Sequence, residues 1–406
     1  DPMNRKAIIV GGGIGGLTAA ICLREIGWDV QIFETAPLIS EIGAGIQISP
    51  NGVKVLQKIG VMPLLEESLF EPEIIEIRLG KSGNKLVQVP MKYVALGRWG
   101  ARYIQIHRAD LIAGLTTRLA ELSPDSIKTD SKVISFDNMR DAASINLQNG
   151  KTHQADLVIG ADGIHSTIRN QMFGAEAARY TGNVAWRAIV PVESLGALAP
   201  PPTGCIWTGQ HKHAVTTRVR SGKTVNFVGI VEHSDWQQEG WHIEGKKADA
   251  LYDFKDWNPT ITNLLKKAES LHKWALFDRA PLPHWHKGHV VLLGDAAHPM
   301  LPSMAQGAVQ SIEDAYVLAQ TLASSSATQI PNACGEYFQK RIKRTTQVQK
   351  ISAKNLNLFH KSNAWTQLIN YAPIWFLGKY TPILLQKRYD WLYGKEFGPL
   401  LPTSLN

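Results

Sequence analysis

Three glycines near the start of the chain have the spacing G-x-G-x-x-G. Gly11, Gly13 and Gly16 directly follow the apolar run Ala7–Val10, which is typical of a buried parallel strand. The first glycine permits a tight turn, the second lets backbone N–H groups approach a phosphate, and the third lets a helix pack closely on the strand. A helical apolar pattern and a second apolar run follow, and that run ends in Glu34. The arrangement predicts a dinucleotide-binding turn in which Glu34 accepts hydrogen bonds from a ribose.

Two further turns carry an aspartate directly after an apolar run. Asp162 and Gly163 follow the run Asp156–Ile159, and Asp295 follows the run Val290–Leu293. Open α/β sheets bind ligands beyond the carboxyl ends of their parallel strands, so all three turns are expected to converge on one ligand. A helix expected from about residue 307 would place its positive N-terminal end near Asp295. The glycine motif alone does not distinguish FAD from NAD. For a flavin, such an end would stabilise the negative charge that grows on reduction, and Asp295 would accept a hydrogen bond from a ribityl hydroxyl, whereas the alternative role of Asp295 is a helix cap.

The remaining pattern divides the chain into three parts. Residues 180–233 contain successive short strands without helices, which indicates an antiparallel sheet inserted into the nucleotide-binding fold. Residues 332–385 have a helical pattern throughout. We therefore expect an α/β fold with a Rossmann-like domain, an inserted antiparallel β-sheet domain and a helical C-terminus. The expected ranges are 3–72, 98–178 and 280–330 for the nucleotide-binding domain, 73–97 and 179–279 for the sheet domain, and 331–406 for the helical region.

Composition excludes several classes of function. The 406 residues include 43 basic and 35 acidic side chains, a formal charge of +8, but the densest basic stretch, residues 340–350, has the pattern of a solvated helix face. We therefore expect no nucleic acid partner, although a basic surface suits an anionic substrate and NAD(P)H. Cys22, Cys205 and Cys334 lie far apart, which predicts neither a metal site nor a disulfide framework and fits a cytoplasmic protein. Charged residues and prolines interrupt the apolar segment 369–385, so stable membrane insertion is not expected.

Three sequence motifs taken together resemble a known family. GGGIGG at 11–16, GADGIHSTIR at 160–169 and GDAAHPMLPSMAQGAVQSIEDA at 294–315 are similar to the three fingerprints of the single-component FAD-dependent aromatic hydroxylases. These are the group A flavoprotein monooxygenases, and the likeness is to their salicylate hydroxylase-like and 3-hydroxybenzoate 6-hydroxylase-like members. The resemblance spans nearly the whole chain, including AWR at 185–187 and RYDWLYG at 388–394. It implies a fold like that of p-hydroxybenzoate hydroxylase.

The resemblance also implies cofactors and contacts. FAD would be the bound cofactor, NADH or NADPH a transient electron donor, and O₂ a co-substrate. The glycine turn would face the pyrophosphate, Glu34 the adenosine ribose, Val133 the adenine, and Asp295 the ribityl chain, while Asp162 and its neighbour would serve both FAD and NAD(P)H. The residues implied to bind the cofactor are Gly11, Gly13, Ile14, Gly15, Gly16, Glu34, Thr35, Gln47, Arg108, Val133, Asp162, Gly163, Asp295, Ala305, Gln306, Gly307, Ala308 and Val309.

The reaction implied by the resemblance is hydroxylation of an aromatic ring. Reduced flavin would carry oxygen as a C4a-hydroperoxide, whose distal oxygen attacks a ring carbon made electron-rich by an ortho or para oxygen or nitrogen. The substrate would be a small phenolic acid or N-heteroaromatic. The protein would orient the ring, favour the deprotonated phenol and exclude water.

His213 is the candidate catalytic residue, with three interpretations. It is a general base for the phenol, a hydrogen-bond donor that orients the ring, or a structural histidine of the sheet. Relatives often have a tyrosine four positions after this histidine, whereas this chain has Thr217. Thr217, Cys205 and Pro299 are the candidate substrate contacts.

Two other functions compete with aromatic hydroxylation. One is hydroxylation or epoxidation of a lipid-like ring of the quinone or carotenoid type, with the aromatic segment 365–393 shielding an apolar entrance. The other is a non-enzymatic binding protein on the same fold, which would not need three intact fingerprints. Alternatively, segment 365–393 has a purely structural role and covers the FAD domain or forms a dimer face. We therefore expect a monomer or homodimer.

Overall fold

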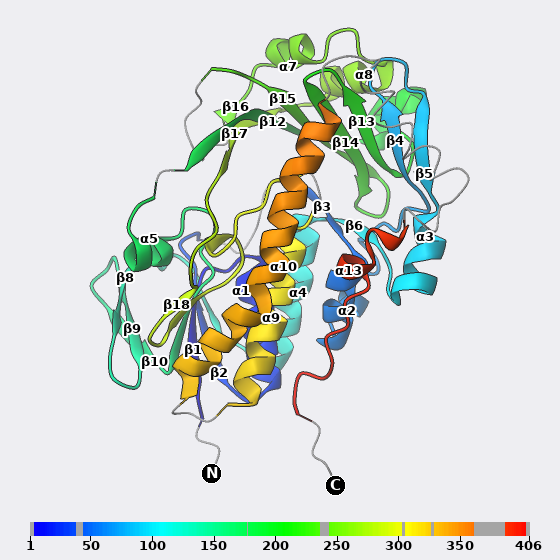
Figure 1. Cartoon of the computed structure of the whole chain (residues 1–406). Coiled ribbons are helices and arrows are strands. Elements are labelled where there is room, and N and C mark those ends of the chain that lie inside the picture. Colours follow the sequence, from blue (N-terminus) through cyan, green and yellow to red (C-terminus); the bar gives the residue numbers. More distant parts are fainter. Residues whose placement is uncertain are drawn as a thin grey trace.

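The protein's structure, a computed structural model, consists of two large sheets connected by long helices (Figure 1). It describes residues 4–37, 44–176, 178–235, 243–302, 305–325, 329–360 and 386–402. The helical pattern predicted for residues 332–385 and the aromatic segment 365–393 therefore fall partly outside the described residues, from residue 361 to residue 385.

The lower sheet in Figure 1 is parallel at its centre and holds the strand that precedes the glycine turn. Its strand order is β18-β19-β11-β1-β2-β7, with the edge strand β18 antiparallel to β19. Strands β1 and β11 are apolar along almost their whole length, as expected of strands covered on both faces. The bounds are β1 Lys6–Val10, β2 Asp29–Phe33, β7 Ile127–Lys128, β11 Leu157–Gly160, β18 His286–Lys287 and β19 Val290–Leu292.

Helices cover the lower sheet and connect it to the upper one. Helix α1 (Ile14–Glu25) packs between α4 (Arg108–Leu122) and α9 (Gly307–Ala323), and its small residues let these helices approach closely. Helix α10 (Ile330–Phe359) lies beside α9 and runs from the lower sheet to the upper sheet (Figure 1). The shorter helices are α2 Pro50–Lys58, α3 Met91–Val94, α5 Thr167–Phe173, α6 Val192–Leu195 and α13 Asp390–Tyr393.

The upper sheet is the inserted sheet that the sequence predicted. Its order is β16-β17-β12-β15-β14-β13-β4-β5, and its pairs are antiparallel except for β13 and β4, which run parallel. The helices α7 (Lys247–Asp253) and α8 (Pro259–Lys267) cover one face over a cluster of buried aromatic and aliphatic side chains. The strands are β4 Ile75–Leu79, β5 Lys85–Val89, β12 Arg179–Pro191, β13 Gly204–Gly209, β14 Lys212–Val219, β15 Thr224–Glu232, β16 Ile243–Glu244 and β17 His272–Asp278.

Two smaller sheets complete the fold. Strand β3 (Gly45–Ile48) pairs antiparallel with β6 (Ile104–His107). The backbone N–H and C=O groups of β3 form their hydrogen bonds with β6. This partner lies nearly sixty positions away, and the local sequence does not reveal it. The third sheet has the order β10-β9-β8, with bounds β8 Val133–Asn138, β9 Ala143–Leu147 and β10 Thr152–Ala155.

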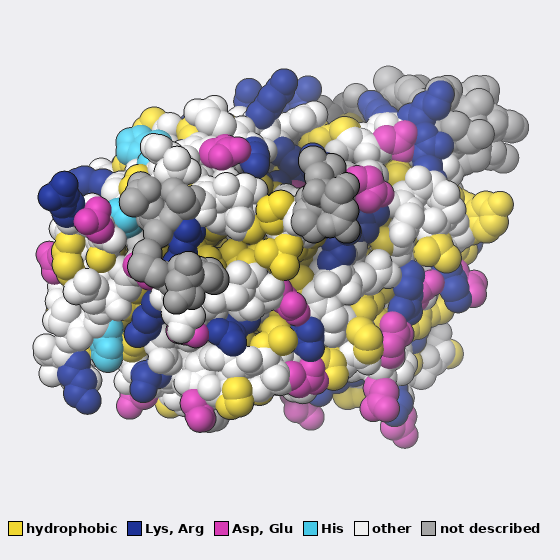
Figure 2. Space-filling view, turned by 90° about the horizontal axis from the view of Figure 1, so that it is seen from below, with side chains coloured by type: hydrophobic (Ala, Val, Ile, Leu, Met, Phe, Trp, Pro, Cys, Tyr) yellow, Lys and Arg dark blue, Asp and Glu magenta, His cyan; other side chains and the backbone are white. Residues whose placement is uncertain are grey.

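The separation of the strands into two large sheets supports the division of the chain into a nucleotide-binding domain and a sheet domain, which we retain as a proposal. Among the described residues, no helix combines the length and the apolar character needed to cross a bilayer. Figure 2 shows the molecule from below, where basic and acidic side chains are interspersed. On this face the formal charge of +8 is not gathered into one basic patch.

A buried cluster of charged side chains connects helices α9 and α10 to the turn that follows β19. Glu313 and Asp314 of α9 are fully buried, as is Arg341 of α10. The Arg341 guanidinium lies 2.6 Å from Asp314 Oδ1 and 2.8 Å from Glu313 Oε1. Asp314 also accepts a hydrogen bond of 3.0 Å from the backbone N–H of Gly294 and contacts the ring of His298. Burial alone would raise the pKa of both carboxyl groups, but their cationic neighbours hold each pKa below its ordinary value.

Breaking this cluster is expected to destabilise the protein strongly. Arg341→Met leaves two buried carboxylates undercompensated, so the free energy of unfolding should fall by about 3–5 kcal/mol. Lys340→Met, one position away on the exposed face of α10, should change it by less than about 1 kcal/mol. Urea unfolding followed by tryptophan fluorescence measures both changes. Equal effects of the two substitutions would contradict the structural role given to Arg341.

Candidate active site

The glycine turn between β1 and α1 is tight toward the sheet and open on its other side. Gly11 has a φ of 110°, a conformation that favours glycine. A side chain at Gly11 would collide with the carbonyl oxygen of Ala161, and one at Gly16 with the carbonyl oxygen of Gly11. A Cβ atom at Gly13 would meet no atom within 4 Å, because Gly13 borders a cavity. At Gly13 the turn therefore presents bare backbone to that cavity.

The cavity has a volume of about 310 Å³ and lies between the two large sheets. Its walls include the ends of β1, β11 and β19, the start of α9, and one face of the upper sheet. The structure thus brings residues of all three predicted turns to one place. The predicted residues that line the cavity are Gly13, Ile14, Gly15, Gln47, Arg108, Gly163, His213, Thr217, Asp295, Ala305, Gly307 and Ala308.

Other predicted residues lie close to the cavity without lining it. The Glu34 carboxylate at the end of β2 accepts a hydrogen bond of 2.6 Å from the N–H of Gly12 and a longer one, 3.4 Å, from Ala36. It therefore lies against the glycine turn, while its contact with a ribose stays a prediction. The remaining predicted residues outside the lining are Gly11, Gly16, Thr35, Val133, Asp162, Gln306, Val309, Cys205 and Pro299.

Asp162 caps a helix instead of facing the cavity. Its carboxylate accepts a hydrogen bond from the Ser166 hydroxyl and one of 2.9 Å from the N–H of Thr167, at the start of α5. Burial raises the pKa of Asp162, although these hydrogen bonds oppose the rise. Gly163, with a φ of 80°, is the residue of this turn that lines the cavity. A direct contact of the Asp162 side chain with a cofactor is therefore not supported by this geometry.

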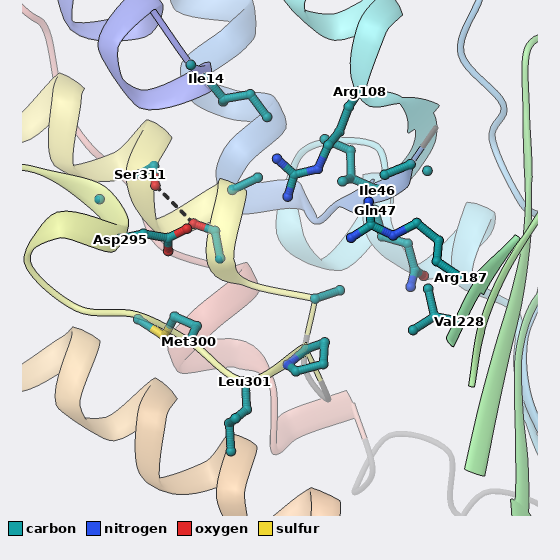
Figure 3. Close-up of a pocket in the computed structure, with 18 of the residues that line it drawn as sticks. Ile14, Ile46, Gln47, Arg108, Arg187, Val228, Asp295, Met300, Leu301 and Ser311 are labelled. Atoms are coloured by element: carbon teal, nitrogen blue, oxygen red, sulfur yellow. Dashed lines mark hydrogen bonds between the residues drawn. The ribbon is translucent and has the colours of Figure 1, made fainter. Parts of the chain in front are cut away.

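Asp295 lies in the cavity wall opposite Arg108 and Arg187 (Figure 3). It belongs to the 3₁₀ turn η4 (Gly294–Ala296), whose first N–H is held by the buried Asp314. Figure 3 shows Ser311 of α9 beside it. Gln306, one position before α9, instead donates a hydrogen bond of 2.8 Å to the buried Ser49 hydroxyl. The start of α9 and the Asp295 turn thus form one rigid wall.

Two cationic side chains reach into the cavity. Arg108 lies at the start of α4 and Arg187 in the middle of β12, and Figure 3 shows both guanidinium groups pointing inward near Gln47. Arg187 lies over the ring of Trp274, with 4.5 Å between the guanidinium carbon and the ring centre. The Gln47 side chain accepts a hydrogen bond of 2.6 Å from the Tyr103 hydroxyl. This part of the cavity is suited to anionic groups.

Alternation along the upper sheet decides which of its residues face the cavity. His213, Val215 and Thr217 of β14 line it, as do Asn226, Val228 and Ile230 of β15. Cys205 is paired with Thr216 and therefore points to the opposite face, where it is buried under α7 and α8. The prediction that Cys205 lines the substrate site was wrong for this reason. Pro299 is also absent from the lining, and its carbonyl accepts a hydrogen bond of 3.0 Å from Gln349.

His213 is buried, with 1% of its surface exposed, and is hydrogen-bonded to a residue that sequence patterns do not indicate. Its Nδ1 lies 2.6 Å from Nε2 of His360, which directly follows α10. Burial, and to a lesser degree the neighbouring His360, lowers the pKa of His213 well below its ordinary value. A neutral imidazole therefore lines the cavity near neutral pH.

Sequence reasoning assigned no role to several residues that line the cavity. Arg187 lies in the AWR segment, and Trp274 lies on β17, a strand that was not anticipated. Asn226 connects the upper sheet to the small β3–β6 sheet, because its side chain accepts a hydrogen bond of 2.9 Å from the N–H of Gly45. The alternating pattern of β15 was a usable signal for Asn226, but it did not show which face points inward.

The residues present fit FAD. Added Cβ atoms at Gly13, Gly163 and Gly307 would each meet nothing within 4 Å, so three wall segments offer bare backbone to a ligand. Backbone amides at a helix start together with the Arg108 cation suit a pyrophosphate. The Asp295 carboxylate suits sugar or ribityl hydroxyls. Among the described residues, no group of His, Cys, Asp and Glu side chains is arranged to hold a metal ion.

Comparison with known proteins agrees with this fit. Residues 4–352 match the family model described as "FAD binding domain". The chain is 35% identical over 377 residues to 6-hydroxynicotinate 3-monooxygenase of Pseudomonas fluorescens, covering 92% of this chain and 94% of that protein. It is 31% identical over 402 residues to 3-hydroxybenzoate 6-hydroxylase of Polaromonas naphthalenivorans, covering 99% and 98%.

Solved structures show the same fold. HpxO of Klebsiella pneumoniae, complexed with FAD and uric acid, matches with a TM-score of 0.83 and 26% identity over 96% of each chain. A salicylate hydroxylase substrate complex matches with a TM-score of 0.81 and 25% identity over the whole of both chains.

Filling the open side of the glycine turn tests where the cofactor binds. Gly13→Ala adds a methyl group that meets no protein atom but projects from the cavity wall, so FAD affinity should fall about tenfold or more while the fold is retained. The matched control is Gly97→Ala, where an added Cβ also meets nothing within 4 Å and which does not line this cavity. Flavin fluorescence titration of the deflavinated variants measures both affinities. An unchanged affinity in Gly13→Ala would contradict the placement.

Proposed function

This chain belongs to the FAD-binding domain family, and from that membership and the cavity we propose that it hydroxylates a small aromatic ring that bears both a hydroxyl and a carboxylate group. It is an FAD-dependent aromatic monooxygenase that uses NAD(P)H and O₂. The resemblance found in the sequence, the α/β fold class and the FAD cofactor are thereby confirmed. The substrate proposal rests on one observation: the cationic side chain of Arg187 and the neutral imidazole of His213 both line the same cavity wall.

The residues that would hold FAD come from both sides of the cavity. We assign the pyrophosphate to Arg108 and the amides of residues 13–15, the ribose to Glu34, and the ribityl chain to Asp295. The start of α9, with Ala305, Gln306, Gly307, Ala308 and Val309, would support the ring system. When bound and reduced by NAD(P)H, FAD supplies the activated oxygen atom.

The upper sheet would hold the substrate ring against this wall. Val215, Val228 and Ile230 offer an apolar surface to the ring, while Thr217 and Asn226 offer hydrogen bonds at one end of it. Enclosure of the ring between the two sheets would exclude water, which would protect the reactive oxygen from loss as peroxide. His213 would accept the proton of the ring hydroxyl, since a neutral buried imidazole is a hydrogen-bond acceptor.

Arg187 would pair with the substrate carboxylate. Its cation lies over Trp274 in the cavity wall, and a guanidinium group binds a carboxylate with two parallel hydrogen bonds. Both curated relatives named above carry names of hydroxylated, carboxylated six-membered rings, which supports the same class here. The two arginines and the polar side chains of the lining favour this class over a lipid-like ring.

The proposal also covers the location of the enzyme, its oligomeric state and its partners. We propose that the enzyme works in the cytoplasm as a monomer or homodimer, without a nucleic acid partner. Support comes from the interspersed charges of Figure 2 and from three buried free cysteines.

A substrate screen tests the proposed class. Hydroxybenzoates, aminohydroxybenzoates and hydroxynicotinates are incubated with the holoenzyme, and NAD(P)H oxidation, peroxide and product mass are recorded together. A member of this class should stimulate NAD(P)H oxidation and yield a product with one added oxygen and little peroxide. Stimulation only by detergent-dispersed quinones or isoprenoid rings would contradict the proposal.

Arg187→Met should weaken binding of the acid specifically. Loss of a charge-assisted hydrogen bond predicts a KM about tenfold or more higher for the carboxylated substrate, with little change for its carboxamide analogue. Arg218→Met is the matched control, because the Arg218 guanidinium donates to the carbonyls of Pro200 and Gly222 on the other face of β14. Equal losses for acid and amide would remove Arg187 from carboxylate recognition.

A further inference from the structure

A continuous chain of hydrogen bonds connects the cavity to the protein surface. It begins at His213 in the cavity wall, whose Nδ1 lies 2.6 Å from Nε2 of His360. Nδ1 of His360 lies 3.1 Å from one carboxylate oxygen of Glu232, the last residue of β15. The other oxygen of Glu232 lies 2.9 Å from Nδ1 of His211. The adjacent strands β14 and β15 meet here with the end of α10, which is distant from them in sequence.

Exposure increases step by step along the chain. His213 is 1% exposed and His360 is 5% exposed, whereas the side chain of Glu232 is 41% exposed. The ring of Phe359 lies 5.2 Å from that of His213 and helps to shield it. The two histidines therefore bridge the buried cavity and a carboxylate that meets water.

The carboxylate at the outer end fixes the direction of every hydrogen bond. Ionised Glu232 can only accept, so Nδ1 of His360 carries a proton and donates it. Neutral His360 then has a lone pair on Nε2, which accepts from Nδ1–H of His213. The same logic leaves a lone pair on Nε2 of His213, and this atom has no hydrogen-bond partner among the described residues. The chain thus prepares His213 to accept a proton.

We propose that His213, His360 and Glu232 form a proton relay that carries the proton of the substrate's ring hydroxyl from the cavity to solvent. The proposal rests on the proposed function, because the relay needs a hydroxylated ring in the cavity. His213 takes the proton, and the other two residues act through it. This gives His213 one role out of the three that the sequence left open.

Each transfer in the relay is balanced. The substrate O–H bond breaks as an N–H bond forms at Nε2 of His213, and the Nδ1–H bond of His213 breaks as one forms at Nε2 of His360. The Nδ1–H bond of His360 breaks as an O–H bond forms on Glu232, which passes the proton to water. Before that release the negative charge has moved from Glu232 to the bound phenolate, and after it Glu232 is a carboxylate again and the proton is in solvent. Neither imidazole carries a net charge before or after the transfer. The reverse sequence returns a proton to the product and restores both histidines.

Burial supports this mode of action. It lowers the pKa of His213 well below its ordinary value and, against the opposing effect of Glu232, lowers the pKa of His360 to about 4. Both rings are therefore neutral near pH 7 and pass a proton without storing it. The relay also accounts for Thr217, which stands where a tyrosine often follows such a histidine. In this chain the second group that contacts His213 comes from the end of α10.

Nitrogen NMR of the holoenzyme labelled with ¹⁵N-histidine tests the arrangement directly. The relay requires the proton on Nδ1 in both His213 and His360, and the signals are assigned by their loss in His213→Gln and His360→Gln. A proton on Nε2 of His213, or a charged ring at neutral pH, would overturn the proposal. This readout needs no substrate and no turnover.

Stopped-flow mixing with 4-nitrophenol tests proton transfer. The probe is mixed with oxidised holoenzyme without NAD(P)H, below the pH at which it ionises in solution, and its phenolate colour is followed together with a pH-indicator dye. The wild type should form phenolate and release a proton. Glu232→Ala and His360→Gln should slow this step by about tenfold or more. Binding of 4-nitrophenol by the wild type only as the neutral phenol would overturn the relay.

Rescue and control variants separate a relay from a structural contact. Added acetate should restore the rate in Glu232→Ala, because the site of the missing carboxylate is open to solvent, and should have no effect on His360→Gln. Asp278→Asn is the matched control, a carboxylate-to-amide change on β17 of the same sheet in a surface ion pair with Arg179. Wild-type rates in Glu232→Ala and His360→Gln, or the absence of acetate rescue, would overturn the proposal.

The two proposals fail in different ways. Fast phenolate formation in a protein that hydroxylates no aromatic acid would contradict the proposed function and leave the relay standing. Hydroxylation that proceeds normally in Glu232→Ala and His360→Gln would contradict the relay and leave the function standing.

Discussion

Parallel pairing of three strands is the constraint on which the site depends. Val10 of β1 pairs with Gly160 of β11, and Gly160 pairs with Leu292 of β19. Because the strands are in register and run in one direction, the residues that follow them leave the sheet at one level. The glycine turn, the turn at Gly163 and the turn at Asp295 are therefore neighbours in space although 150 residues separate Gly13 from Gly163 and 132 separate Gly163 from Asp295. The cavity, and with it the place for FAD, follows from this alignment.

The third turn needs more than pairing, because β19 is short and, among the described residues, only the 3₁₀ turn η4 lies between it and α9. Buried charges supply the missing restraint. The Asp314 carboxylate accepts a hydrogen bond from the N–H of Gly294 and forms an ion pair with Arg341 of α10. Glu313 accepts a hydrogen bond of 2.5 Å from the side chain of Asn51 in α2. Such a cluster tolerates little displacement, since any opening leaves a charge buried without a partner. The helix that supplies Arg341 is followed directly by His360 beside β14, so α10 connects the proposed cofactor wall to the proposed proton relay.

Short sequence patterns predicted those features that depend on interactions between residues close together in the chain. The strand ends, the glycine conformations at Gly11 and Gly163 and the cavity positions of Asp295 and His213 all follow from short patterns read against a known architecture. What could not be predicted depends on distant partners. His360 lies 147 positions from His213, and strand β3 exists because β6 pairs with it. Cys205 was misplaced because alternation defines two faces of a strand but does not tell which face is covered by helices.

The central claim is that three separated turns hold one FAD molecule. Hydrogen–deuterium exchange of the deflavinated chain during titration with FAD tests it most directly. The account predicts that amides in residues 11–16, 160–163 and 294–309 become protected together, with one common midpoint. Protection of a single turn, or different midpoints for the three, would contradict the account.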